Sequence, residues 1–188
     1  MTKPDDSRHG HHMHWGSASP ERLALMRRVI DGINDYIESK ELVDLGSGDG
    51  SITKILAEHC KRVYAVDNDR ELLQLLSDNC KGIENIVPTL SETERIALGS
   101  GTVDAVFSSS SFHDMPSGYE NEIARVLRVG GFAIVFDWNE SRTAHGPPSE
   151  IRLSKDAVTK KFVAAGFSII KEKDYETHYL LVFRKSKA

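Results

Sequence analysis

A short apolar run leads directly into a glycine loop in the stretch Leu42-Val43-Asp44-Leu45-Gly46-Ser47-Gly48-Asp49-Gly50. Residues 41–45 read as a buried parallel strand, and residues 51–59 follow as a helix. A strand, a tight glycine turn and a helix N-terminus make a site where backbone N–H groups point outward and the helix dipole favours negative charge. The glycines let a ligand approach the backbone closely. The stretch therefore predicts a ligand site at the carboxyl end of the first strand.

An acidic residue ends the second predicted strand, residues 62–66, in the tripeptide Asp67-Asn68-Asp69. Asp67 follows Gly48 by about 20 residues, the distance at which nucleotide-binding folds place an acid that accepts hydrogen bonds from ribose hydroxyls. Asp69 is suited to cap the helix predicted over residues 70–79. A carboxylate at a strand end is commonly only a turn or cap residue. Together with the glycine loop, however, it indicates a nucleoside site.

The rest of the chain alternates strand-like and helix-like segments. A helix is predicted from Pro20, because Ser19 is a suitable N-cap and proline suits the first helical position. Residues 89–100 read as a loop with one helical turn, and residues 139–153 read as a linker. The short connection before the last strand predicts an antiparallel pair at the end of an α/β fold. Further strands are expected at residues 85–88, 102–108, 132–137, 167–171 and 178–185, and further helices at residues 119–127 and 154–165.

Size and composition set the broad class. The 188 residues are enough for one domain with a sizeable core. The net charge of −4 argues against a broad nucleic-acid surface. No apolar run approaches the roughly 20 residues that a membrane-spanning helix needs. The two cysteines, Cys60 and Cys80, show neither metal-ligand spacing nor a disulfide framework. We expect a cytoplasmic protein without membrane contact and without a resident metal.

The first 19 residues differ from the rest. Residues 1–19 are polar and are expected to form a flexible, histidine-rich segment, followed by a single domain over residues 20–188. The histidine tract has three interpretations, namely a metal-binding tract, a lid over a cofactor, and a solvated tail, which is the simplest. Trp15 is unusual in such a tail and is a candidate for contact with the substrate at the mouth of the site. The histidines are His9, His11, His12 and His14.

Three segments together resemble the class I S-adenosylmethionine-dependent methyltransferases, and among them the small type 11 methyltransferase domains. Asp44–Gly50 matches the D-x-G-x-G-x-G motif of this family, Asp67 matches its ribose-binding acid, and Glu122–Gly131 is similar to its E-x-x-R-V-L-K-P-G-G segment. The alternate glycines also differ from the G-x-G-x-x-G of dinucleotide enzymes. The resemblance implies a Rossmann-like fold with a seven-stranded, mostly parallel sheet, an antiparallel last strand and helices on both faces.

The resemblance further implies how the methionine end of S-adenosylmethionine would be held. Backbone groups of Gly46, Ser47 and Gly48 would hold the methionine moiety. Asp44 would orient the loop or reach the amino group, and the backbone of Ser108, at the end of the fourth strand, would meet the same ammonium.

The nucleoside end is implied in the same way. Asp67 would bind the ribose, and Asn68 would lie along the adenine. Many relatives carry an acid after the third strand, where it bonds the adenine amino group. At that place this chain has Ser91 and Glu92, and either could substitute.

Candidates for acid–base chemistry follow the fourth strand. His113 titrates near neutral pH and can accept a proton from a hydroxyl, amine or thiol, with Asp114 beside it. In the alternative interpretation His113 bonds the backbone and Asp114 caps a helix, since many methyl transfers need only proximity and desolvation. Trp138 is a candidate wall of the substrate pocket or a packing residue. Arg152 is a candidate for binding an anionic acceptor or an ordinary solvated arginine.

The leading hypothesis is an S-adenosylmethionine-dependent methyltransferase that acts on a small-molecule acceptor. One alternative is a nucleic-acid or protein methyltransferase that works with a partner. Another is a non-catalytic S-adenosylmethionine-binding module, whose acceptor pocket would be filled by Trp15 or Trp138. The sequence leaves the acceptor and the oligomeric state open.

Overall fold

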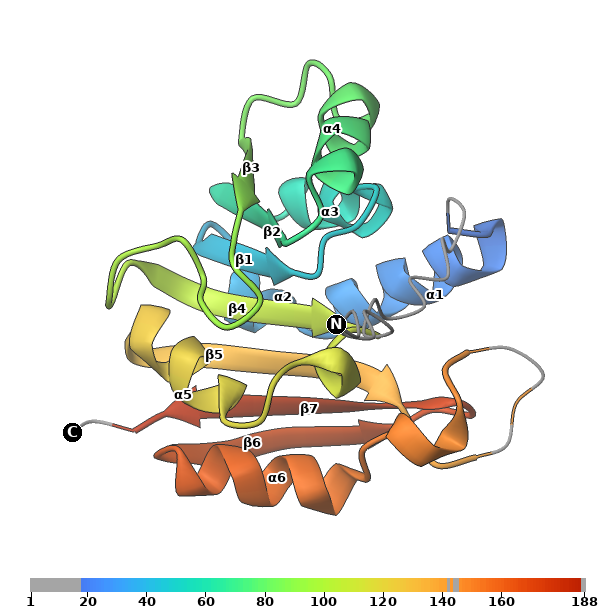
Figure 1. The fold of residues 1–188 in the computed structure, drawn as a ribbon, viewed down its shortest axis with the longest axis vertical. Helices are drawn as coiled ribbons and strands as arrows, with labels where there is room; N and C mark the ends of the chain where they lie inside the picture. The colour runs from blue at the N-terminus through green and yellow to red at the C-terminus, as the bar shows by residue number, and fades with distance from the viewer. Residues whose placement is uncertain (1–17, 142, 144–145, 187–188) are drawn as a thin grey trace, which may run out of the picture.

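The computed structural model describes residues 18–141, 143 and 146–186, and their strands form one seven-stranded sheet in the order β3-β2-β1-β4-β5-β7-β6 (Figure 1). Within these ranges no helix is both long enough and apolar enough to cross a membrane. The strands are β1 (Glu41–Leu45), β2 (Arg62–Asp67), β3 (Ile86–Leu90), β4 (Val103–Ser109), β5 (Leu127–Trp138), β6 (Phe167–Asp174) and β7 (His178–Lys185). The helices are α1 (Pro20–Asp31), α2 (Asn34–Ile37), α3 (Ser51–Ala57), α4 (Arg70–Asn79), α5 (Tyr119–Val126) and α6 (Lys155–Ala164), with 3₁₀ turns η1 (Phe112–Asp114) and η2 (Ser149–Ile151).

Strand direction confirms the predicted fold class. β1 pairs in parallel with β2 and β4, β3 pairs in parallel with β2, and β5 with β4. β7 lies antiparallel between β5 and β6. Because parallel strands end at the same edge of a sheet, the ends of β1, β2, β4 and β5 line one edge, where α/β folds bind their ligands.

Helices cover both faces of the sheet (Figure 1). Successive residues of β1 point to opposite faces, so that Leu42 belongs to one apolar cluster and Val43 to another. The Leu42 cluster includes Met26 of α1 and Leu56 of α3, whereas the Val43 cluster includes Phe162 of α6. Burial on both faces explains why the central strands read as continuous apolar runs.

The connection from α5 to β5 is tighter than the sequence predicted. The strand was expected to begin at Phe132, after Gly130-Gly131 had ended the helix. Instead the helix ends at Val126 and the strand follows at once. A Cβ at Gly131 would lie 2.8 Å from the carbonyl oxygen of Asp104 on β4. Gly131 therefore lets β4 and β5 approach closely, and the glycine pair does not itself terminate the helix.

The loop over residues 91–100 also differs from the prediction. A helical turn was expected, and the structure shows a bent loop closed by a single β-bridge. Helix α5 holds this loop in place. The amide of Ile96 donates to Glu122 Oε1 at 2.8 Å, and Arg125 donates to the carbonyl oxygens of Ile96 at 3.0 Å and Leu98 at 2.9 Å. The polar residues of the Glu122–Gly131 segment thus fix a loop beside the ligand edge.

Candidate active site

The glycine loop between β1 and α3 is packed on one side and open on the other. Gly46 has a φ of +73°, and a Cβ there would lie 2.7 Å from the Cβ of Ser111. Gly48 has a φ of +54°, and nothing lies within 4 Å of the place its Cβ would take. Residues with side chains rarely adopt such φ values. The loop is therefore held against the end of β4 at Gly46 and presents bare backbone at Gly48.

Two buried polar side chains beside the loop are suited to a charged ligand. Asp44 Oδ2 accepts a hydrogen bond from Thr53 Oγ1 at 2.6 Å. Burial raises the pKa of Asp44 to about 7, against the effect of the Thr53 bond and with a contribution from the charge of Asp67. The hydroxyl of Ser47 is buried and has no hydrogen-bond partner within the described part of the chain. A ligand carrying an ammonium and a carboxylate group would satisfy both side chains.

The acid at the end of β2 is joined directly to this loop. Asp67 Oδ2 accepts a hydrogen bond from the Gly48 amide at 2.9 Å, and its Oδ1 accepts one from the Asp69 amide at 3.0 Å. The side chain is only partly buried. Each carboxylate oxygen has a further lone pair, so Asp67 can still accept bonds from a vicinal pair of ribose hydroxyls.

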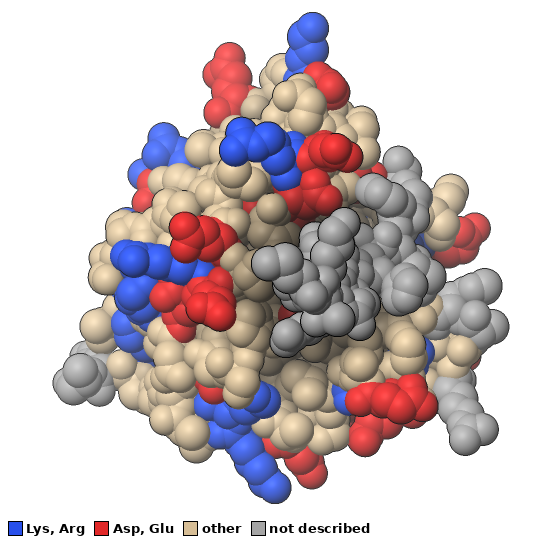
Figure 2. Space-filling view, in the orientation of Figure 1, with Lys and Arg blue, Asp and Glu red and all other residues tan. Residues whose placement is uncertain are grey.

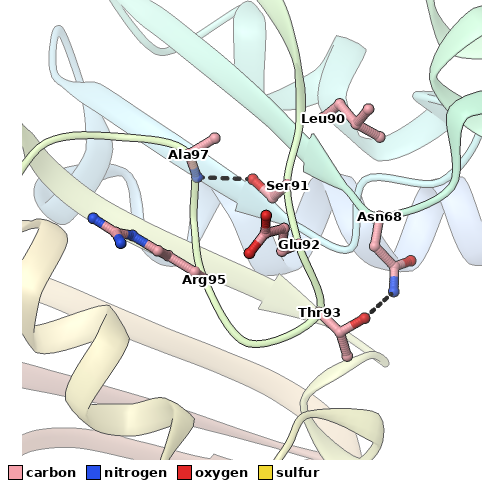
Figure 3. Close-up of a pocket in the computed structure, with 7 residues that line it drawn as sticks. All are labelled: Asn68, Leu90, Ser91, Glu92, Thr93, Arg95 and Ala97. Atoms are coloured by element: carbon pink, nitrogen blue, oxygen red, sulfur yellow. Dashed lines mark hydrogen bonds between the residues drawn. The ribbon is translucent and has the colours of Figure 1, made fainter.

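A hollow of about 770 Å³ lies where β2 and β3 end (Figure 3). Asn68 Nδ2 donates to Thr93 Oγ1 at 3.2 Å, and the Ser91 hydroxyl accepts a bond from the Ala97 amide at 2.9 Å. Glu92 is exposed at the same wall. The structure thus brings the predicted adenine residues together, with Ser91 holding the loop and Glu92 available to a ligand. The hollow is lined by Asn68, Leu90, Ser91, Glu92, Thr93, Arg95 and Ala97.

Serines join the end of β4 to the glycine loop. Ser108 is buried and pairs in register with Leu45. Its hydroxyl lies 2.8 Å from the Ser111 hydroxyl, which also bonds the Leu45 carbonyl at 2.9 Å. Ser108 therefore lies at the start of the loop, where the resemblance placed it.

The His113 imidazole is fixed by a carboxylate from β5. Nδ1 of His113 lies 2.8 Å from Oδ1 of Asp137, and the His113 amide donates to Oδ2 at 2.9 Å. The Trp138 amide donates to Oδ1 at 2.8 Å. The side chains of His113 and Asp137 are 5% and 1% exposed. The predicted partner of His113 was its neighbour Asp114, whereas the partner that orients the ring is Asp137.

The charges around His113 favour its protonated form. Burial alone would lower the pKa of His113, but the hydrogen bond and charge of Asp137, together with the charge of Asp114, raise it above the ordinary value of 6.5. Asp114 Oδ2 lies 3.3 Å from Nε2, and the Asp114 side chain is 67% exposed. The pair His113–Asp137 is therefore a histidine–carboxylate dyad, with Asp114 at its solvent side.

Trp138 packs within the same edge of the sheet. Its ring centroid lies 4.1 Å from that of His178, the residue opposite it on β7. A Cβ at Gly146 would come within 2.9 Å of the indole. Trp138 therefore has a packing role, and its contact with His178 also places it beside the serines that end β4.

Arg152 has a structural role. Its side chain is buried, and it donates to backbone and hydroxyl oxygens of the segment that follows β5. The guanidinium also lies 5.1 Å from the Trp138 ring centroid. The acceptors are the carbonyl oxygens of Pro147, Asn139 and Ser141 and the hydroxyl of Thr143. Neither the solvated nor the anion-binding interpretation of Arg152 matches this arrangement.

One charged residue at this edge was not predicted from the sequence. Arg22 of α1 extends to the end of β4, where its guanidinium lies 3.4 Å from the Ser110 hydroxyl and 3.5 Å from that of Ser109. No motif marked it, because a single arginine in a helix reads as a solvated residue. Trp15 and the predicted histidine tract lie outside the described residues.

Comparisons with known proteins agree with this geometry. A family model described as "Methyltransferase domain" matches residues 43–135. An uncharacterized methyltransferase of Mycobacterium tuberculosis (strain ATCC 25618 / H37Rv) is 34% identical over 106 residues, which cover 55% of this chain and 42% of that protein. A demethylmenaquinone methyltransferase of Tropheryma whipplei (strain Twist) is 26% identical over 123 residues, 64% of this chain and 51% of that protein. The crystal structure of a SAM dependent methyltransferase from Aquifex aeolicus has a TM-score of 0.82 at 23% identity, covering 89% of this chain and 94% of that one.

The sheet order, the glycine loop and the acid after β2 define a Rossmann-like methyltransferase fold. Residues 43–135 match the methyltransferase-domain family, and the fold is that of the class I S-adenosylmethionine-dependent methyltransferases. S-adenosylmethionine is the cofactor that this family and fold imply. The matched region spans about half the length of the curated relatives, between 42% and 51%.

Proposed function

We propose that the protein transfers the methyl group of S-adenosylmethionine to a small-molecule acceptor and that His113 accepts the acceptor's proton. One observation carries the proposal. Ser111 and Met115, two residues before and after His113, both reach the space beside Gly46, at 2.7 Å and 3.9 Å from the place of its Cβ. The dyad of His113 and Asp137 is thereby tied to the loop that holds the cofactor's reactive end.

The residues of the loop and of the neighbouring strand ends would bind the cofactor. In its ionised form Asp44 pairs with the ammonium, and the bare backbone of Gly46–Gly48 with the Ser47 hydroxyl holds the methionine carboxylate. The backbone of Ser108 borders the same group. When bound, S-adenosylmethionine supplies an electrophilic methyl group.

The nucleoside would occupy the hollow at the ends of β2 and β3. Asp67 accepts hydrogen bonds from the ribose hydroxyls, Asn68 lies along the base, and Glu92 faces its amino group. Ser91 acts by keeping the wall of the hollow in place, since its hydroxyl already accepts the Ala97 amide.

The dyad would set the direction of proton transfer. An Nδ1–H donated to Asp137 leaves a lone pair on Nε2 of His113. The acceptor's O–H, N–H or S–H proton passes to Nε2 as the acceptor atom forms its bond to the methyl carbon. The carboxylates of Asp137 and Asp114 stabilise the imidazolium that results. Asp114 thus assists the proton acceptor without itself being the base.

A small acceptor is favoured over a nucleic acid. Basic and acidic side chains are interspersed over the face shown in Figure 2, whereas nucleic-acid surfaces concentrate positive charge. The relative from Tropheryma whipplei is named for demethylmenaquinone, a quinone and not a nucleic acid. Trp138 would form part of the acceptor wall through its contact with His178, and Trp15 is proposed to contact the acceptor as well. We place this reaction in the cytoplasm and in one domain over residues 20–188, with Cys60 and Cys80 as free thiols.

Cofactor binding is the first test. Titration with S-adenosylmethionine should raise the melting temperature in a concentration-dependent manner, and NAD should leave it unchanged. Stabilisation by NAD alone would refute the assignment.

Turnover is the second test. The wild-type protein should transfer labelled methyl groups to at least one member of a small-molecule library. In His113→Asn the rate of this transfer should fall on the order of 10²–10⁴-fold. His59→Asn is the matched control, because His59 hydrogen-bonds Asn34 away from the site. Binding of the cofactor without transfer to any acceptor would favour the non-catalytic module, and transfer only after addition of a protein or RNA fraction would favour a partner-dependent enzyme.

A further inference from the structure

Arg22 is the charged residue at the ligand edge to which the proposed mechanism assigns no role. Its side chain is partly buried, and burial lowers the pKa of its guanidinium against the opposing charges of Asp137 and Asp49. Its contacts are long ones, at 3.4 Å and 3.5 Å, to the hydroxyls of Ser110 and Ser109. Within residues 18–141, 143 and 146–186 no carboxylate forms an ion pair with it.

A partly buried guanidinium without an anion is energetically unfavourable. Arginine side chains inside proteins are usually paired, because removing their charge from water is costly. Arg125 pairs with Glu122, and Arg128 pairs with Asp104. The buried Arg152 has no carboxylate partner within the described residues, but its guanidinium donates to four carbonyl and hydroxyl oxygens. Arg22 has neither arrangement, since its contacts in the described residues are the two long ones to serine hydroxyls. Arg22 is therefore positioned to receive a negative group from a ligand.

The surroundings of Arg22 are held in a strained arrangement. Ser110 has a φ of +53°, which is unusual for a residue with a side chain. Its amide donates to the Phe136 carbonyl at 2.8 Å, and its hydroxyl lies 3.3 Å from Nε2 of His178. Burial lowers the pKa of His178 to about 4, so this imidazole is neutral and Arg22 supplies the positive charge at this place. Backbone strain of this kind is characteristic of ligand sites.

The four serines at the end of β4 and directly after it, Ser108 to Ser111, face two sides of the site. Ser108 and Ser111 face the glycine loop, through contacts with each other and with the Leu45 carbonyl. Ser109 and Ser110 face α1 and β7, through Met26 Sδ at 3.7 Å and through His178. Arg22 thus contacts the serines on the α1 and β7 side, and the charges of Asp137 on β5 and Asp49 in the glycine loop both act on it. The hollow lined by Asn68 and Glu92 lies at the ends of β2 and β3, and Arg22 is not among its lining residues.

We propose that Arg22 binds a carboxylate of the methyl acceptor, so that the substrate is a small carboxylic acid whose hydroxyl, amine or thiol is methylated. This inference rests on the proposed function and specifies its substrate class. Arg22 fixes one end of the acid, and His113 Nε2 receives the proton from the nucleophilic atom at the other end.

The test uses the full-length protein saturated with S-adenosylhomocysteine, which retains the cofactor's own carboxylate. Equilibrium binding is measured for small hydroxy and amino acids, each paired with its uncharged amide, for example 4-hydroxybenzoate with 4-hydroxybenzamide. At least one acid should bind tenfold or more tightly than its amide. Arg22→Met should abolish this preference, and Arg28→Met, an exposed arginine on the same helix, should preserve it.

The cofactor's carboxylate is the competing anion, and a second measurement separates the two. The affinity ratio between S-adenosylhomocysteine and 5′-methylthioadenosine, which lacks the amino-acid moiety, should be unchanged in Arg22→Met. A tenfold fall in that ratio would assign Arg22 to the cofactor and overturn the proposal. So would equal binding of every acid and its amide, or no binding of any acid. If S-adenosylhomocysteine itself fails to bind the wild type, the proposed function fails as well.

Discussion

The Nδ1 atom of His113 lies 2.8 Å from Oδ1 of Asp137, a residue 24 positions later in the chain. The carboxylate also accepts the amides of His113 and Trp138, so its orientation is fixed by three hydrogen bonds. This fixed carboxylate sets both the direction and the proton affinity of the imidazole.

Replacing this carboxylate should therefore slow the reaction and shift its pH dependence. The wild-type value of kcat/KM should rise with pH through a His113 pKa above 6.5, because the neutral imidazole is the base. Asp137→Asn removes the main influence that raises this pKa. The rising limb should move to lower pH, and kcat should fall on the order of 10²–10⁴-fold. An NMR titration of the imidazole resonances provides a second measurement, and an unmoved limb would contradict the dyad.

Asp44 should make the ligand-free protein less stable as the pH rises. Its pKa is raised from 3.8 to about 7, so the folded protein holds this proton more tightly than the unfolded chain. The stabilisation is complete below about pH 4 and is lost as the pH approaches 7, with a total effect on the order of 4 kcal/mol. Thermal unfolding between these pH values should show the loss in the wild type and a flatter curve in Asp44→Asn.

Affinity for the cofactor should rise with pH because of the same residue, Asp44, whose ionisation lowers the stability of the ligand-free protein. The ammonium needs the ionised carboxylate, so affinity for S-adenosylmethionine should increase with pH up to about 7, with protons released on binding. Calorimetry in two buffers of different ionisation enthalpy measures that release. Equal heats in both buffers would show that Asp44 is already ionised in the free protein.

Variants of Asp67 and Asp69 should distinguish a role in ribose binding from a role in helix capping. Asp69 accepts the amides of Glu71 and Leu72 at the start of α4, so Asp69→Ala should cost about 1 kcal/mol of stability. Asp67→Asn should instead weaken adenosine ligands and reduce the preference for adenosine over 2′-deoxyadenosine derivatives. Competition binding provides this ratio. A preference kept in Asp67→Asn but lost in Asp69→Ala would reverse the assignment.

The contact between Gly46 and Ser111 should appear as a coupling in stability. Gly46→Ala places a Cβ 2.7 Å from that of Ser111, whereas Gly48→Ala meets no neighbour within 4 Å. Gly48→Ala should cost about 1–2 kcal/mol from its positive φ alone, and Gly46→Ala should cost more. Ser111→Gly removes the obstructing atoms, so the Gly46→Ala/Ser111→Gly pair should lose less stability than the sum of its single changes in denaturant unfolding. Strict additivity would mean that the loop relaxes freely.

Much of the fold was predictable because local and long-range signals agree. The apolar run at Glu41–Leu45 and the capped helix Arg70–Asn79 were predicted with the bounds they have. The early start of β5 was not, because a glycine pair indicates a helix end as readily as close strand packing. The helical turn expected within residues 91–100 is overridden by side chains of α5, which no local pattern reveals.

The candidate site was predictable where its residues belong to a sequence motif at the end of a strand. Asp44, Gly48 and Asp67 lie close together as expected, since their positions follow from strand ends in a parallel sheet. The Asp137 partner of His113 and the approach of Arg22 depend on how β5 and α1 pack, and both elements are distant in sequence from η1. Asp114 was predicted as the partner because it is adjacent to His113 in the sequence. The contact with Asp137 depends on the packing of β5 against η1, which a single segment of sequence does not reveal.

The two ends of the loop after β3 are fixed, by the Ser91 hydroxyl on one side and by Glu122 and Arg125 on the other. Its tip lines the hollow at the ends of β2 and β3 with Glu92, Thr93 and Arg95. The contacts of this tip, the Glu92–Arg95 bridge and the hydrogen bond from Asn68 to Thr93, lie within the wall of the hollow itself. Substitutions in this tip should therefore change the shape of the hollow without disturbing the rest of the fold. Engineered insertions or substitutions there should widen the hollow for cofactor analogues with enlarged bases, while the sheet and the His113–Asp137 pair keep their positions.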